Sequence, residues 1–222
     1  MNRVRDMGAE RYGLALILIL AAMVFIMATP DGKWANVISL NLQALALIAS
    51  IRAAQPRRSL RITVAVVICL VLLAAWIQAF FTDNVNEDFV RLATFSLVVI
   101  ATPAIAWGLI RQVKARGKIT THTMLGVLCI YMLMSLAFSA AFGAIGAVSG
   151  EPFFTQGVDV GTTNNYLYYS LTTITTVGMG DFTPASNLGR SFTAAEALIG
   201  QIYVITVVAV IVGNLGRSRK DG

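Results

Sequence analysis

The chain has 222 residues, of which 57% are hydrophobic and only 13% are charged, so it is too apolar to cover its own surface as a soluble globule does. Its 17 Lys and Arg outnumber its 11 Asp and Glu, which gives a formal net charge of +6. The apolar composition predicts a membrane protein. The positive excess could suit a nucleic-acid partner, but the basic residues gather on one side of the expected membrane topology, which decides against that class.

Six apolar segments are long enough to cross the hydrocarbon core, for which a helix needs roughly 20 residues. In chain order they are residues 12–29, 34–51, 60–81, 89–110, 124–148 and 192–212. A shorter and more polar segment, residues 166–176, separates the last two. We therefore predict an all-α membrane protein with six transmembrane helices and one re-entrant helix, divided into an N-terminal four-helix region (1–118) and a C-terminal region (119–222).

The first apolar segment follows three arginines, as the apolar core of a secretory signal does. The segment is long for that role, and residues 27–31 make a poor small-residue cleavage site. We therefore expect residues 12–29 to remain as the first transmembrane helix.

Basic residues gather on one side of this six-helix topology, and acidic residues prevail on the other. Because cytoplasmic loops carry an excess of Lys and Arg, both termini are expected in the cytoplasm, with the chain in a bacterial inner (plasma) membrane. The lipid bilayer is then a partner, with anionic lipid head groups as a further contact. The basic set comprises Arg3, Arg5, Arg11, Arg52, Arg57, Arg58, Arg61, Arg111, Lys114, Arg116, Lys118, Arg217, Arg219 and Lys220.

The segment 166–184 is too polar and too short to cross lipid alone, so it must be sheltered by protein. We expect it to enter the membrane as a short helix and to return as an extended strand. Gly178 and Gly180 can adopt mirror-image backbone conformations, which would turn successive carbonyl groups toward one axis. Such oxygens can replace the hydration shell of a potassium ion, with Thr176 adding its hydroxyl and Val177 turned away toward the supporting helix.

The run Thr176-Val177-Gly178-Met179-Gly180-Asp181 resembles the Thr-Val-Gly-Tyr-Gly-Asp selectivity filter of tetrameric potassium channels. The resemblance covers roughly residues 120–216, an outer helix, pore loop and inner helix. It implies a homotetramer that conducts K⁺ passively, with K⁺ as the permeant ion held at Thr176, Val177, Gly178 and Met179. It also places Tyr168 and Tyr169 as the aromatic pair of the pore helix, and Gly200 as a gating hinge.

Met179 departs from the pattern, because the family has an aromatic residue there that braces the filter. Methionine is flexible and packs loosely. Two alternatives therefore stay open: a weakly selective monovalent cation (Na⁺/K⁺) channel, and a non-conducting membrane subunit that binds partners.

One filter strand supplies a quarter of a ring, so four chains are needed to close the ring. Related potassium uptake transporters carry four pore repeats in one chain, and no repeat of the filter occurs here. We also expect no enzymatic activity, no cofactor and no nucleic-acid partner, since no catalytic or phosphate-binding motif is found.

Four helices before a pore suggest a voltage sensor, which needs several arginines at three-residue spacing within the membrane. The fourth segment has Arg91 at its outer end and none until Arg111. We therefore predict a channel that is not strongly voltage-gated. Asn36, Asn41 and Gln43 in the second segment are expected to form interhelical hydrogen bonds rather than a ligand site.

The last helix carries further candidates. Glu196 could bond to Thr172, Thr173 or a backbone amide and support the pore helix, or could be a buried acid without a role. Gly200 could be a hinge or could allow close packing. Val204, Val208 and Val212 follow at four-residue intervals and are expected to line the inner cavity. Few residues follow Gly216, so we expect no cytoplasmic gating domain in this chain.

Overall fold

The fold is described from a computed structural model covering residues 3–30, 32–54, 58–81, 107, 121–157 and 162–218. Within these ranges the chain is helical apart from short loops, and its only β-type pairing is a single bridge between Phe154 and Pro184. The predicted fourth segment, which contains Arg91, lies outside the described residues except for Trp107.

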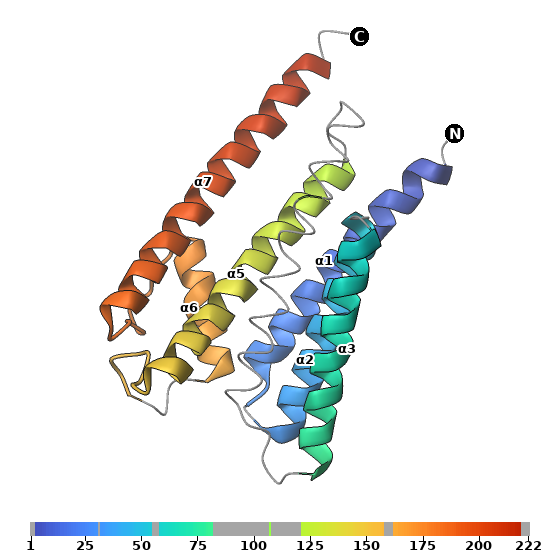
Figure 1. The fold of residues 1–222 in the computed structure, drawn as a ribbon. Coiled ribbons are helices and arrows are strands. Elements are labelled where there is room, and N and C mark those ends of the chain that lie inside the picture. The colour runs from blue at the N-terminus through green and yellow to red at the C-terminus, as the bar shows by residue number, and fades with distance from the viewer. Residues whose placement is uncertain are drawn as a thin grey trace.

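Five long helices and one short helix make up the described part of the chain (Figure 1). Three of them are long and apolar enough to cross a membrane, over Trp34–Ala54, Arg58–Ile77 and Met124–Ser149, and Tyr12–Ala28 is a shorter apolar stretch. The chain is thus an all-helical membrane protein. The bounds are α1 (Arg3–Ala28), α2 (Lys33–Ala54), α3 (Arg58–Phe81), α5 (Thr121–Ser149), α6 (Thr163–Ile174) and α7 (Asn187–Ser218).

The long helices all extend beyond the apolar segments that the sequence marks. The last one begins at Asn187 rather than 192 and continues to Ser218 rather than 212. Hydropathy identifies only the part of a helix that suits hydrocarbon, whereas backbone hydrogen bonding continues into the polar interface.

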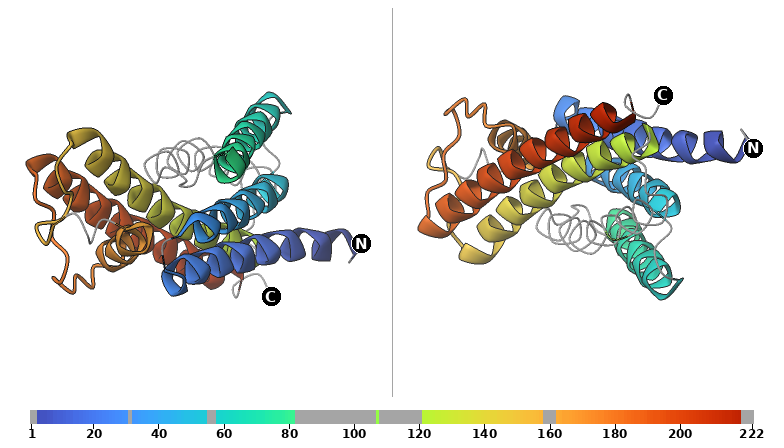
Figure 2. Two further views of the ribbon diagram at one scale, coloured as in Figure 1. Left: turned by 90° about the horizontal axis from the view of Figure 1, so that it is seen from below. Right: turned by 90° about the horizontal axis from the view of Figure 1, so that it is seen from above.

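The helices α5 and α7 run alongside each other, and α6 packs against both near one end (Figures 1 and 2). On the other side of α5 the helices follow in the order α1, α2, α3, with α1 contacting α2, α5 and α6. The start of α1 and the end of α7 lie at the same end of the molecule, away from α6 (Figure 1).

A single apolar core joins the N-terminal helices to the C-terminal ones. Ile19 of α1, Leu47 of α2 and Leu133 of α5 are all fully buried in it, and Leu167 brings α6 into the same cluster. Because a membrane provides little hydrophobic driving force between helices, close van der Waals packing of this kind holds them together.

Two polar contacts also join α1 to the C-terminal helices. The Cys129 thiol donates to the Tyr12 carbonyl at 3.6 Å, and the side-chain amide of Asn164 donates to the Met27 carbonyl at 2.9 Å. The first helix is therefore anchored to α5 at one level and to the start of α6 at another.

The amides of α2 depart partly from expectation. Asn36 and Gln43 are buried, but Gln43 Oε1 has no hydrogen-bond partner among the described residues. The Asn41 side chain donates to the Val37 carbonyl of its own helix at 2.7 Å. The interhelical prediction is therefore wrong for Asn41, because a carbonyl four residues back lies within easy reach of a short amide.

Candidate functional site

The short helix α6 begins three residues earlier than the sequence suggested. Thr162 caps it by accepting a hydrogen bond from the Asn165 amide at 3.2 Å, and the helix ends at Ile174. Threonine is a favoured cap, so this start could have been recognised. The buried residues of the helix mix polar and apolar types, which fits a helix sheltered by protein; they are Tyr166, Leu167, Tyr169, Ser170, Thr173 and Ile174.

Directly after α6 the backbone alternates in handedness. Thr176, Gly178 and Gly180 have φ of 58°, 54° and 80°, and no other described residue between α6 and α7 has a positive φ. A Cβ built on Gly178 or Gly180 would meet nothing within 4 Å in the single chain, so glycine is required there by conformation. Thr176 adopts this conformation at a strain of about 1–3 kcal/mol.

Hydrogen bonds fold the start of this segment back onto the last turn of α6. The Thr176 amide donates to the Thr173 carbonyl at 2.9 Å, and the Gly178 amide donates to the Thr172 carbonyl at 3.0 Å. The side chains of Val177 and Met179 are 57% and 66% exposed in the single chain. Val177, which was expected to lean on the supporting helix, is thus largely uncovered.

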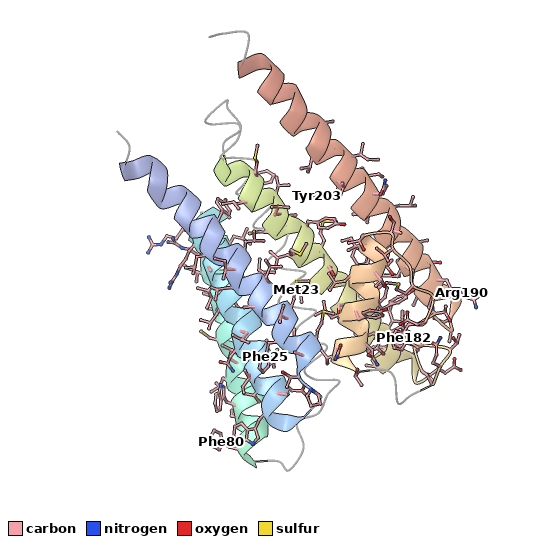
Figure 3. All side chains as sticks on the ribbon, turned by 180° about the vertical axis from the view of Figure 1, so that it is seen from behind. Met23, Phe25, Phe80, Phe182, Arg190 and Tyr203 are labelled. Carbon is pink, nitrogen blue, oxygen red and sulfur yellow. The ribbon has the colours of Figure 1, made fainter. Side chains whose placement is uncertain are left out.

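An aromatic cluster braces the outer side of α6. Its buried members include Phe142, Phe153 and Tyr169. Phe182, one residue past Asp181, lies 5.0 Å from Phe154 and 5.9 Å edge-on from Tyr168, measured between ring centroids (Figure 3). Aromatic packing next to this segment therefore comes from Phe182 and from the loop after α5, which sequence reasoning missed although two adjacent phenylalanines mark that loop.

The same loop is joined to the chain beyond Gly180 by backbone pairing. The Thr155 amide donates to Thr183 at 2.9 Å, and the Ala185 amide donates to Phe153 at 2.8 Å. The Gln156 side chain donates to the Asp181 carbonyl at 2.8 Å. These bonds fix the position of the segment after the two glycines.

The two predicted aromatic residues of α6 take different partners. The Tyr168 ring contacts the Phe182 ring, which lies beyond the two glycines. The Tyr169 hydroxyl instead lies 2.8 Å from the Thr193 hydroxyl of α7. Thr172 donates to the Tyr169 carbonyl of its own helix at 3.0 Å, and Thr173 is buried.

Glu196 is fully buried behind α6, and its partner is Ser170. The Ser170 hydroxyl lies 2.5 Å from Glu196 Oε1, 2.7 Å from the Ser135 carbonyl and 3.1 Å from the Ser135 hydroxyl. The second oxygen of Glu196, Oε2, has no hydrogen-bond partner among the described residues. The carboxyl group therefore joins α5, α6 and α7, although through a serine rather than through Thr172 or Thr173.

Gly200 is the point of closest contact between α7 and α6. A Cβ there would lie 2.6 Å from both Ile174 Cγ1 and the Ile174 carbonyl oxygen. The same carbonyl accepts a hydrogen bond from the Tyr131 hydroxyl of α5 at 3.0 Å. This geometry gives Gly200 a packing role, and its role as a hinge stays a prediction.

One turn further along α7, Tyr203 lies between α7 and α5 (Figure 3). Its hydroxyl donates to the Val127 carbonyl at 2.6 Å, and its ring stacks on Tyr131 with centroids 5.8 Å apart. Val204 is partly exposed at 41%, while the side chains of Val208 and Val212 lie outside the described residues.

Residues 126–216, which contain this whole site apart from the first residues of α5, match the family described as ion channel. A curated relative, the probable potassium channel protein 2 of Methanocaldococcus jannaschii, is 32% identical over 88 residues. That match covers 40% of this chain and 21% of the relative, so the chain spans about a fifth of the length of the relative. These matches show that the C-terminal part of the chain, residues 126–216, is similar to ion channels, among them a probable potassium channel.

Proposed function

We propose that the protein is a potassium-selective channel that conducts K⁺ passively, with residues 119–222 forming the pore and residues 1–118 surrounding it. The observation that carries the proposal is the positive φ at Thr176, Gly178 and Gly180. In an ordinary strand successive carbonyls point to opposite sides, and reversing the handedness at every second residue turns them to one side. A row of such oxygens can replace the hydration shell of K⁺.

The helix α6 supports cation binding at the inner end of this row. Its last residue is Ile174, two residues before the first filter residue, Thr176, and the C-terminus of a helix carries a partial negative charge. The Ile174 carbonyl is held in place by Tyr131. A cation that leaves the filter on this side would meet a favourable potential without a fixed charge.

The exposed filter supports assembly into a homotetramer. Irregular backbone at membrane depth is tolerated only where protein or a water-filled cavity surrounds it, and residues 175–181 are exposed in the single chain. Apolar side chains of α7, such as Leu198 and Ile202, are also exposed at 64% and 63%. Cyclic symmetry of four copies would enclose the strand and supply neighbours for this helix.

The charge distribution supports an orientation with both termini in the cytoplasm. Arg52 ends α2 and Arg58 and Arg61 begin α3, at the same end of the molecule as the start of α1 and the end of α7. An excess of basic residues marks the cytoplasmic side of inner-membrane proteins.

A weakly selective cation channel is the second candidate, and Met179 favours it. This side chain is 66% exposed and takes no part in the aromatic cluster, so nothing in its own chain stiffens the filter at that position. A filter that deforms would distinguish Na⁺ from K⁺ less sharply.

Reversal potentials of the purified protein in planar bilayers would separate the candidates. With KCl and NaCl mixed in opposite ratios on the two sides, the potassium channel predicts a reversal potential near the K⁺ equilibrium value, and the weakly selective channel predicts one near zero. Gly178→Ala is the control, because a side chain at φ 54° is strained and should abolish the current. Absence of current from the unaltered protein under all conditions would refute both and favour a partner-binding role.

A further inference from the structure

Two cavities flank the ends of α2 and α3 that lie away from α6. The first, of about 430 Å³, lies between α2 and α3, and the second, of about 410 Å³, lies between α1, α2 and the start of α3. Both are within the range of about 300–1,000 Å³ in which small-molecule sites fall. Ile48, Arg52 and Arg61 line both cavities, so the two meet along one pair of arginines.

The remaining walls of the cavities are almost wholly apolar. Ile62, Ala65 and Cys69 form one face of α3 in the first cavity, at spacings of three and four residues. Leu14 and Leu18 of α1 and Leu45 of α2 form the wall of the second. Each cavity therefore extends from the arginines along the transmembrane part of its helices.

Among the residues whose side chains the structure describes, the two guanidinium groups have no anionic partner. No acidic side chain lines either cavity, and neither Arg52 nor Arg61 forms a hydrogen bond or an ion pair with another described residue. An arginine at a membrane interface forms strong, often bidentate bonds with phosphate oxygens. Two positive charges between two apolar cavities match an anionic head group with two hydrocarbon chains.

We propose that this site binds an anionic diacyl phospholipid of the cytoplasmic leaflet, with its phosphate between Arg52 and Arg61 and one acyl chain in each cavity. Soluble phosphate would satisfy the arginines alone, whereas a lipid also fills the apolar walls. The site is independent of the filter, so a failure of the proposed ion selectivity would leave it untouched.

Native mass spectrometry of the full assembled protein tests this directly. The protein is mixed with equal amounts of phosphatidylglycerol and phosphatidylcholine in detergent micelles and is then freed from the detergent inside the mass spectrometer. Phosphatidylglycerol should stay bound to the protein in preference to phosphatidylcholine. Each of Arg52→Gln and Arg61→Gln should lower its retention about fivefold, and the double variant about thirtyfold. Arg58→Gln is the matched control, because Arg58 is exposed on the first turn of α3 but lines neither cavity.

Two further measurements distinguish binding of a lipid from binding of a soluble anion. Ala65→Phe fills the first cavity and leaves both arginines in place, so it should lower lipid retention. Millimolar inorganic phosphate should not displace the lipid. Equal retention of both lipids, an Arg58→Gln effect as large as that of the double variant, or displacement by phosphate would each overturn the proposal.

The rate at which a thiol reagent modifies the cysteines gives a second measurement, which needs no substitution in the apolar walls of the cavities. Cys69 lines the first cavity and is exposed, while Cys129 is buried, so a thiol reagent should modify Cys69 selectively. Phosphatidylglycerol should slow this modification relative to phosphatidylcholine in the unaltered protein, and the effect should disappear in the double arginine variant. Equal rates with the two lipids would contradict occupancy of the cavity.

Discussion

At the scale of single residues, Gly200 and Glu196 show how tightly α7 is fitted to α6. The first leaves no room for a methyl group against the Ile174 carbonyl, and the second places a buried carboxyl group against Ser170. Both positions could be identified from the sequence as special. Their partners could not, because the rotation of α7 about its axis is set by packing that no local pattern encodes.

Gly200→Ala is expected to destabilise the assembled protein by about 1–3 kcal/mol, since the new methyl group would meet backbone atoms that cannot move aside. The thermal unfolding midpoint in detergent measures this. Gly13→Ala is the control, because its nearest neighbour, Leu125 Cδ1, would be 4.0 Å from the new atom. A pure hinge would give the opposite result, with unchanged or higher stability and a lower open probability.

Glu196 and Ser170 are expected to be energetically coupled by about 0.5–3 kcal/mol, the range for contacting residues that share one hydrogen-bond network. A double-mutant cycle with Glu196→Ala and Ser170→Ala, using the free energy of unfolding in mixed micelles, gives the coupling. Additive effects of the two substitutions would show that Glu196 is a buried acid without a supporting role.

At the scale of helices, α5 contacts both α6 and α7. Tyr131 binds the last carbonyl of α6, while Tyr203 of α7 binds the Val127 carbonyl and stacks on Tyr131. Movement of the C-terminal part of α7 away from α5 would have to break the hydrogen bond between the Tyr203 hydroxyl and the Val127 carbonyl. Tyr131 and Tyr203 therefore couple the position of α7 to the last turn of α6.

Tyr203→Phe should raise the open probability, because it removes the bond to Val127 and keeps the ring stacked. Loss of this hydrogen bond should destabilise the closed state by about 0.5–1.5 kcal/mol, which corresponds to a rise of roughly two- to twelvefold in the ratio of open to closed channels. Single-channel recording measures it, with Tyr131→Phe as the comparison that removes the Ile174 bond instead. An unchanged open probability would mean that α5 and α7 move together.

The order of the helices could be predicted largely from the sequence, and their neighbours could not. Hydropathy and the polar segment 166–176 indicated the long helices and the re-entrant one, because membrane insertion imposes length and composition. The contact of α1 with α5 and α6, through Cys129 and Asn164, has no local signal. The aromatic contribution of Phe182 was likewise missed, since it depends on how two loops meet.

At the scale of the whole molecule, the absence of an arginine series governs the response to voltage. Each elementary charge that crosses the field contributes about 2.3 kcal/mol per 100 mV, so a chain that moves few charges responds weakly. We expect the open probability to change by less than about tenfold between −100 and +100 mV in planar bilayers. A steep sigmoidal dependence would contradict this and would require charge movement elsewhere in the chain.

The central claim is that four copies of the segment from Thr176 to Gly180 meet on one axis with their carbonyl oxygens facing it. A density map of the purified protein in lipid nanodiscs with K⁺ tests it most directly. We expect fourfold symmetry and a row of ion densities between the four strands. A monomer or a dimer, or an axis without density between these residues, would contradict it.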